Sequence, residues 1–202
     1  MAAPRHRRDA MIRIAIVVED ASDGRALKAI IERLLEPARV QVRYFPARGR
    51  SEVGRKAGAL IEVAAKHAPC VLVIVDLDGD DPAGHAQLQR IRQACATAPV
   101  RARMVGVAQE IEAWFLADAA AVLARAGAPG GYKVNRRTDV IGDPKRELST
   151  ILRRLLGRGY TAARDAERLA RDLDPEEAAR WNQSFADFAT LVRSCSGRGE
   201  AG

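Results

Sequence analysis

The sequence predicts an α/β protein with a central, mostly parallel four-stranded sheet flanked by helices. Four short apolar runs rich in β-branched residues recur in the first half of the chain, at about residues 12–18, 40–45, 71–75 and 104–107. Segments with a helical spacing of apolar residues separate these runs. Strands that alternate with helices form parallel sheets through right-handed crossovers, and their strands are buried on both faces.

The intervening helices are predicted from their capping and turn residues. Ser22 and Ser51 can each accept hydrogen bonds at the start of a helix, and Pro82 with Gly84 precedes a third helix. The predicted helices cover about residues 22–36, 52–67 and 85–97.

Beyond Asp118 the pattern changes to helices alone. Asp143 followed by Pro144 predicts a helix that begins with a capping carboxylate, and Ser184 is predicted to cap the last helix. We therefore divide the chain into a flexible arm, a core with the sheet, a helical extension packed on that core and a flexible tail. These segments comprise residues 1–10, 11–120, 121–195 and 196–202.

The composition favours a cytoplasmic protein that has no membrane partner. None of the apolar runs approaches the roughly 20 residues that a membrane-spanning helix needs, and the basic N-terminus lacks the apolar stretch of a secretory signal. Cys70, Cys95 and Cys195 are odd in number and widely spaced, which suits a reducing compartment and gives no zinc-binding spacing.

The net charge of +7 makes nucleic acid a candidate partner. The charge is concentrated in residues 121–158, where nine basic residues face three acidic ones, Asp139, Asp143 and Glu147. The basic residues are Arg125, Lys133, Arg136, Arg137, Lys145, Arg146, Arg153, Arg154 and Arg158. This segment either faces phosphate groups or is an ordinary solvated surface.

Carboxylates follow the third apolar run directly. Because strand side chains repeat every two residues, Asp76 and Asp78 are expected to leave the same face of the strand end. Two close carboxylates repel each other unless a cation compensates them, and a hard divalent ion such as Mg²⁺ or Mn²⁺ prefers oxygen ligands. Asp80 and Asp81 either support this site or cap the helix after Pro82.

Acidic residues also follow the first and fourth strands. Glu19, Asp76 and Glu110 fall at or just after carboxyl ends of parallel strands, which meet at one edge of a sheet, and this predicts a metal site there. Residues two apart on a helix face different ways, so one of Glu110 and Glu112 is expected to reach the metal if both are helical. If Glu110 is still extended or is the first helical residue, both can reach it. Lys145, in the first turn of its helix, is expected either to hold a phosphate or to be an ordinary solvated lysine.

The residues after Glu112 are predicted to have structural roles. Trp114, Phe115 and Leu116 are expected in the core rather than on a base-stacking surface. Asp118 is expected at a helix surface or beside an arginine. The alternative for Glu112 itself is an exposed surface position.

Two known acidic-site families match the sequence only in part. VVED and VDLDGDD resemble the acidic pocket of response-regulator receivers, but that family has Thr or Ser at the end of the fourth strand, where this chain has Ala108-Gln109-Glu110. It also has a Lys that ends a fifth strand, and this sequence shows no such strand. The DxD of haloacid-dehalogenase phosphatases normally lies on the first strand and precedes Thr or Val, where this chain has Asp80.

The Toprim fold of topoisomerases, primases and OLD-type nucleases matches better. Its hallmarks are a glutamate after the first strand, usually in a loop like E-G-x-x-D, and a DxD after the third strand. Glu19 and Asp23 fit the first motif, with Asp20 in place of the glycine, and Asp76 with Asp78 fits the second.

Three further segments extend this resemblance along the chain. They are QEIEAWFLAD at 109–118, DPKRELSTIL at 143–152 and SFADFATLV at 184–192. With them the chain resembles, over about residues 12–193, the bacterial Toprim-like family designated DUF4276, which is related to OLD-type Toprim nucleases.

The resemblance implies a Mg²⁺-dependent or Mn²⁺-dependent site that cuts or joins phosphodiesters in DNA or RNA, as in nuclease-like proteins of bacterial defence. The residues expected to carry out the chemistry are Glu19, Asp76, Asp78, Glu110 and Lys145. The expected metal ligands are Glu19, Asp76, Asp78, Glu110 and Glu112. The alternative is a non-catalytic nucleic-acid-binding or sensor module that retains the acidic site. The sequence has no P-loop, so an ATPase partner would be a separate chain, and a homodimer is a candidate assembly.

Overall fold

A computed structural model describes residues 11–79, 85–128 and 130–196 of the chain. Its centre is a four-stranded sheet in the order β2-β1-β3-β4 with every pair parallel, which confirms the predicted fold class. The strands are β1 (Ile12–Val18), β2 (Val40–Pro46), β3 (Cys70–Asp76) and β4 (Arg101–Val107). β4 begins earlier than predicted because it is an edge strand, where exposed Arg101 and Arg103 alternate with buried Ala102 and hide the apolar pattern.

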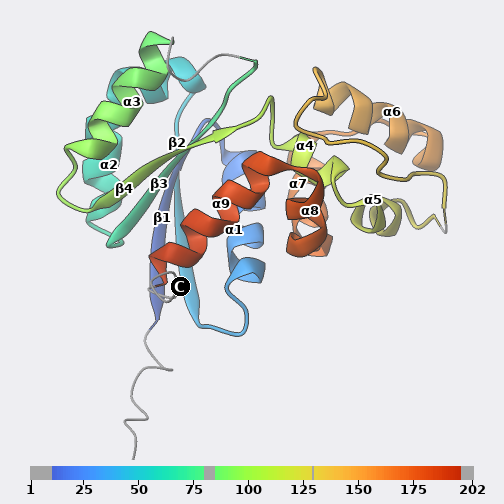
Figure 1. Cartoon of the computed structure of the whole chain (residues 1–202), viewed down its shortest axis with the longest axis horizontal. Helices are drawn as coiled ribbons and strands as arrows, with labels where there is room; N and C mark the ends of the chain where they lie inside the picture. The colour runs from blue at the N-terminus through green and yellow to red at the C-terminus, as the bar shows by residue number, and fades with distance from the viewer. Residues whose placement is uncertain (1–10, 80–84, 129, 197–202) are drawn as a thin grey trace, which may run out of the picture.

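Helices cover both faces of the sheet (Figure 1). On one side lie α2 (Arg50–Ala65) and α3 (Ala86–Ala96), and on the other lie α1 (Ala21–Leu34) and α9 (Gln183–Cys195). Because strand side chains alternate, Ala15 and Val17 pack under α2 and α3, whereas Ile14 and Ile16 pack under α1 and α9.

The second half of the chain is helical, as its sequence predicts. After β4 come α4 (Glu112–Leu116), α5 (Ala119–Ala126), α6 (Pro144–Leu156), α7 (Ala162–Asp172) and α8 (Pro175–Trp181). The predicted start of α6 is confirmed, because the Asp143 carboxylate accepts a hydrogen bond from the Arg146 amide at 2.9 Å. No helix within the described part of the chain is long and apolar enough to cross a membrane.

The caps of the first two helices differ from the prediction. Asp20 begins α1 and accepts hydrogen bonds from the amides of Ser22 and Asp23 at 2.6 and 3.1 Å. A carboxylate two residues earlier thus replaces the predicted Ser22 cap. α2 likewise begins before Ser51, after Gly49, whose φ of 85° suits glycine.

α9 is capped by Asn182 rather than by the predicted Ser184. The buried Asn182 side chain accepts a hydrogen bond from the Phe185 amide at 2.9 Å. The Ser184 hydroxyl has another role, since it accepts hydrogen bonds from the Ala108 amide at 3.1 Å and from Trp114 Nε1 at 2.9 Å. Ser184 therefore fastens the start of α9 to the end of β4 and to α4.

A disulfide joins Cys70 to Cys195. The two residues are 125 positions apart in sequence, but their Cα atoms lie 5.8 Å apart, so wide spacing in the sequence does not separate them in the fold. The bond links the start of β3 to the end of α9. Cys95 is a free, buried thiol, and burial raises its pKa to about 11.

Candidate functional site

The sheet has its topological switch point between the neighbouring strands β1 and β3. The chain leaves β1 toward β2 on one side and leaves β3 toward β4 on the other, which opens a crevice beyond their carboxyl ends. Glu19 directly follows β1, and Asp76 is the last residue of β3. Glu19 Oε1 accepts a hydrogen bond from the Asp76 amide at 3.0 Å, so the two predicted site residues meet at this crevice.

Asp23, in the first turn of α1, lies at the same crevice. It lines a small enclosed space together with Glu19, Asp76 and the apolar side chains of Leu27 and Ile74. Burial raises the pKa of Asp23 to about 7, and the charges of nearby carboxylates add to this effect. The sequence analysis placed Asp23 in the glutamate motif after the first strand but not among the metal ligands or catalytic residues. Its position four residues after Glu19 was the signal that could have placed it there.

The carboxylates at this crevice destabilise one another's charged forms. Burial raises the pKa of Asp76 well above its ordinary value, and the charges of Asp23 and Glu19 raise it further. Burial also raises the pKa of Glu19, although the hydrogen bond from the Asp76 amide opposes this change. A cation bound here would relieve this repulsion.

Asp78 does not share a strand face with Asp76, so that prediction is wrong. β3 ends at Asp76, and Asp78 lies in a turn with a left-handed φ of 49°, where strand alternation no longer applies. Its side chain is 57% exposed and forms an ion pair with Arg50 Nη1 at 3.6 Å. Arg50 Nη1 also donates to the carbonyl oxygens of Asp76 and Leu77 at 3.1 and 3.0 Å, which places one cation beside this turn.

Two backbone outliers flank the crevice. Asp78 and Gln109 both have positive φ values, 49° and 59°, and the Asp78 amide donates to the Gln109 carbonyl at 3.3 Å. Left-handed conformations are uncommon outside glycine and cluster at functional sites. The turns after β3 and β4 are thus held in this conformation next to the carboxylates.

Lys145 contacts both Glu110 and Glu112 at the other side of the crevice. We call the carboxylates of Glu19, Asp23, Asp76, Glu110 and Glu112 together the acidic rim. Its Nζ lies 3.2 Å from Glu110 Oε1 and 3.6 Å from Glu112 Oε1, and its amide donates to Glu110 Oε2 at 3.3 Å. Glu110 therefore occupies the start of α6, where a phosphate was expected. Glu112 is 1% exposed, so a surface position for it is wrong. Partial burial opposes the charged form of Lys145, but Glu112 and Glu110 raise its pKa above the ordinary value.

Two buried oxygens between these groups are unsatisfied. Within the described residues, neither Glu112 Oε2 nor the Tyr160 hydroxyl makes a hydrogen bond, although the two side chains interact. Burial raises the pKa of both groups. Buried polar atoms normally have partners, so these two can accommodate one more polar atom of a ligand or water.

The described carboxylates do not form a group of three or more that could hold one metal ion. Across residues 11–79, 85–128 and 130–196, no three His, Cys, Asp or Glu side chains are placed to hold one ion together. Asp80 and Asp81, predicted as supporting or capping groups, lie outside the described residues. The carboxylates of Glu19 and Asp76 are therefore the two predicted ligands that lie together at the crevice.

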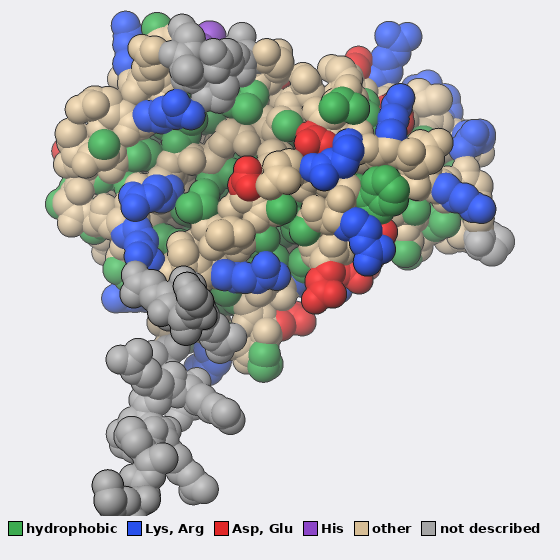
Figure 2. Space-filling view, in the orientation of Figure 1, with side chains coloured by type: hydrophobic (Ala, Val, Ile, Leu, Met, Phe, Trp, Pro, Cys, Tyr) green, Lys and Arg blue, Asp and Glu red, His purple; other side chains and the backbone are tan. Residues whose placement is uncertain are grey.

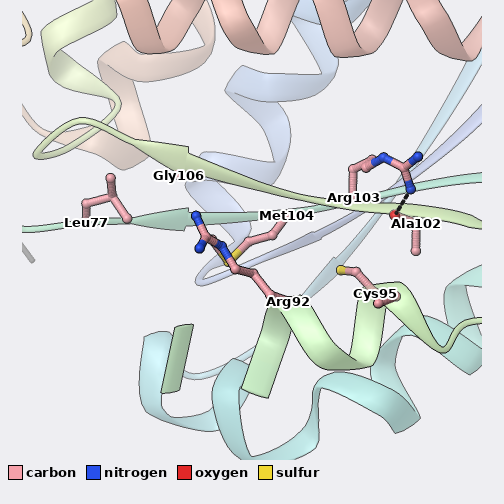
Figure 3. Close-up of a pocket in the computed structure, with 8 residues that line it drawn as sticks. Leu77, Arg92, Cys95, Ala102, Arg103, Met104 and Gly106 are labelled. Carbon is pink, nitrogen blue, oxygen red and sulfur yellow. Dashed lines mark hydrogen bonds between the residues drawn. The ribbon is translucent and has the colours of Figure 1, made fainter. Parts of the chain in front are cut away.

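Another hollow, of about 410 Å³, lies between β4 and α3 (Figure 3). Leu77, Cys95 and Met104 line it, and the side chains of Arg92 and Arg103 stand at its edge. None of the described residues that line it is a carboxylate, so the described part of this hollow is distinct from the acidic crevice.

Much of the charge in the basic segment is already neutralised. Four of its cations form ion pairs, and Lys145 contacts Glu110 and Glu112 at the rim. The four ion-paired cations are Arg125 and Arg158 with Asp165, Arg136 with Glu147, and Arg137 with Asp139. Four others, Lys133, Arg146, Arg153 and Arg154, form no ion pair with any described residue. Lys and Arg side chains are exposed over the end of the molecule that holds α5 and α6 (Figure 2). The cations free to bind phosphate are therefore fewer than the sequence indicates.

A comparison with protein families finds one model, described as a domain of unknown function (DUF4276), that matches residues 18–193. No curated protein and no solved structure matches the chain. The match includes Glu19, Asp76 and the segment that begins α6, and it spans most of the 202 residues. The chain therefore belongs to the DUF4276 family.

Proposed function

We propose that this protein is a Mg²⁺-dependent or Mn²⁺-dependent phosphodiesterase that acts on nucleic acid, in the manner of a nuclease of bacterial defence. The observation that carries the proposal is the group of carboxylates at the switch point. Glu19, Asp23, Asp76 and Glu112 all have raised pKa values, chiefly because they are buried. Such a concentration of perturbed acids in a crevice is typical of a functional site.

Glu19 and Asp76 would hold the ion, with Asp23 beside them. A bound divalent ion would supply charge neutralisation and would polarise a phosphate group for attack. The Glu19–Asp76 hydrogen bond and the enclosed space next to Asp23 support this assignment.

The remaining rim residues would position the substrate and stabilise its charge. Lys145 is a cation beside the crevice, and its Nζ can move from Glu110 and Glu112 to a phosphate oxygen. Glu19 has an alternative role as the general base if Asp76 holds the ion without it, because a raised pKa brings a carboxylate closer to the operating pH. Arg50 holds the turn that carries Asp78 and so fixes that side of the crevice.

A cleavage assay with single-site variants tests this proposal. The purified protein is incubated with labelled single-stranded and duplex DNA and RNA in Mg²⁺ or Mn²⁺. Asp76→Asn and Glu19→Gln should abolish cleavage while leaving the circular dichroism spectrum unchanged. Asp187 is an exposed acid on α9, and Asp187→Asn removes the same charge as the site variants. This variant is the matched control and should cleave normally. Cleavage that survives in both site variants would show that the chemistry lies elsewhere.

The second candidate is a non-catalytic nucleic-acid-binding module, and one observation favours it. The Glu110 carboxylate accepts hydrogen bonds from both the amide and the Nζ of Lys145, so an anionic side chain already lies at the start of α6. This module would bind nucleic acid in a salt-sensitive way without turnover. Retained binding together with no cleavage of any DNA or RNA, in either metal, would favour the module over the enzyme.

A further inference from the structure

α6 presents a polar, basic face to solvent beside the acidic rim. Lys145, Ser149 and Arg153 follow one another at four-residue intervals, so they lie along one side of the helix. Leu148 and Leu152, in the adjacent row of the helix that packs into the core, are fully buried. At 1.5 Å per residue the polar face extends about 12 Å away from the rim.

A hollow of about 540 Å³ lies along this face. Its wall includes Glu110 and Lys145, which also belong to the rim, so the hollow opens directly beside the candidate site. The side chains of Arg146, Arg153 and Tyr160 also line the hollow and can contact a ligand in it.

Hydrogen-bond donors in this hollow are unused. Tyr160 is only 7% exposed, and its hydroxyl interacts with the buried Glu112 side chain without forming a hydrogen bond of good geometry to any described residue. The Ser149 hydroxyl oxygen accepts the Tyr160 amide at 3.2 Å, which holds the wall in place. The exposed guanidinium of Arg153 forms no ion pair or hydrogen bond with any described residue.

Gly159 allows these groups to approach one another. A Cβ atom at Gly159 would lie 2.5 Å from Ser149 Oγ and 3.2 Å from Arg153 Nη2. A larger residue at position 159 would therefore require the Ser149 side chain, which accepts the Tyr160 amide, to move. Glycine at this position allows that hydrogen bond to form.

The charges in the hollow favour an anion. The two acids in its wall are engaged, because Glu110 pairs with Lys145 and Asp143 caps α6 by accepting the Arg146 amide. The buried Glu112 carboxylate behind Tyr160 also lies against Lys145, at 3.6 Å from its Nζ. The guanidinium groups of Arg146 and Arg153 remain uncompensated among the described residues. Guanidinium groups and a buried hydroxyl match the donor needs of phosphate oxygens.

We propose that this hollow binds a phosphodiester group of a nucleic-acid strand, adjacent to the phosphate at the acidic rim. The proposal rests on the proposed function, which it deepens by assigning the part of the site that holds the flanking strand. Arg153 supplies the charge, and the Tyr160 hydroxyl supplies a neutral donor to a phosphate oxygen.

Binding measured without catalysis tests the proposal. Fluorescence anisotropy of a labelled single-stranded oligonucleotide is recorded in EDTA at several salt concentrations. Arg153→Gln should weaken binding about three- to tenfold and flatten the plot of log K against log[salt] by about 0.7, because one phosphate contact is lost. Tyr160→Phe should weaken binding without changing this slope. Arg90 is an exposed arginine on α3, and Arg90→Gln removes the same charge as Arg153→Gln. This variant is the control and should change neither the affinity nor the salt slope.

Equal effects of Arg153→Gln and Arg90→Gln would overturn the assignment, because they would show a general charge effect. Competition by inorganic phosphate or a mononucleotide at the same phosphate concentration as the oligonucleotide would overturn the assignment to a strand. Urea midpoints confirm that each variant is folded. The anisotropy assay needs neither metal nor turnover, so its result is independent of the cleavage assay. The Arg153 effect can be found even if Asp76→Asn shows that the proposed chemistry is wrong. It can likewise be absent even if that chemistry is right.

Discussion

Asp165 offers a sharp test of what stabilises the helical extension. Its carboxylate is 0% exposed, and three arginines contact it, with Arg125 Nη2 at 2.6 Å, Arg164 Nη2 at 2.9 Å and Arg158 Nη1 at 3.1 Å. The Thr161 amide also donates to it at 3.1 Å. One carboxylate therefore joins α5, α7 and the loop between α6 and α7.

Asp165→Asn keeps the shape of the side chain but removes its charge. Removal of one partner from a buried ion pair costs about 3–5 kcal/mol. The side chains of Arg158 and Arg164 are 35% and 41% exposed and can be rehydrated, whereas Arg125 is 13% exposed and cannot be fully rehydrated. We therefore expect the lower end, about 3 kcal/mol, which is a large part of a typical total stability of about 5–15 kcal/mol.

Urea unfolding followed by far-UV circular dichroism measures this loss. Asp172→Asn changes an exposed acid on the same helix and should cost less than about 0.5 kcal/mol. A loss in Asp165→Asn no larger than that in Asp172→Asn would refute the reasoning.

The effect of Asp165 should also depend on pH. Burial alone would raise the pKa of Asp165, but hydrogen bonds from Arg164 and Arg158 outweigh it and lower the pKa below its ordinary value. A carboxylate with a lowered pKa stabilises the fold above its unfolded pKa of about 3.9 and loses this effect as the pH falls. The difference between the wild type and Asp165→Asn should therefore narrow below about pH 4.

Three further predictions concern the acidic rim and the disulfide. Burial raises the pKa of Asp23 to about 7, so the folded protein keeps a proton that the unfolded chain releases above about pH 4. Stability in EDTA should therefore fall as the pH rises from about 4 to about 7, and Asp23→Asn should flatten this dependence of the urea midpoint; the same slope in both proteins would contradict the assignment. Mg²⁺ should raise the thermal midpoint of the wild type by binding the folded state but should not raise that of Asp76→Asn, and equal shifts in calorimetry would count against the proposed ligand. Reduction of the Cys70–Cys195 disulfide, which joins residues 125 positions apart, should lower the free energy of unfolding of the wild type by about 3–5 kcal/mol. The same reductant should not change the free energy of unfolding of Cys195→Ser, which lacks the disulfide. A loss of the same size in Cys195→Ser would show that the reductant acts elsewhere.

Local patterns predicted the sheet well, because parallel strands buried on both faces need continuous apolar runs. Such runs are visible without knowledge of the fold. The same reasoning placed Trp114, Phe115 and Leu116 in the core, and all three are completely buried. The meeting of Glu19 and Asp76 followed from the rule that parallel strands end at one edge.

Contacts between distant segments were beyond such rules. Asp118 was expected at the surface or beside an arginine, but it is buried, caps α5 and accepts the Asp174 amide at 2.7 Å. Lys145 was expected either to hold a phosphate or to be an ordinary solvated lysine, and the ion pair with Glu110, 35 positions earlier in the chain, was not foreseen. The first outcome depends on how α8 packs beside the start of α5, and the second depends on how α6 packs beside the segment before α4. No local pattern encodes either contact.

The Ser184 hydroxyl ties the acidic rim to the last helix. It accepts hydrogen bonds from the Ala108 amide and from Trp114 Nε1, which lie on either side of Glu110 and Glu112 in the chain. Lys145 and the Asp78 amide hold the same segment from α6 and from the turn after β3. During synthesis the contacts from α6 and from the turn after β3 are available first, and the tie from Ser184 is added last, when α9 has left the ribosome.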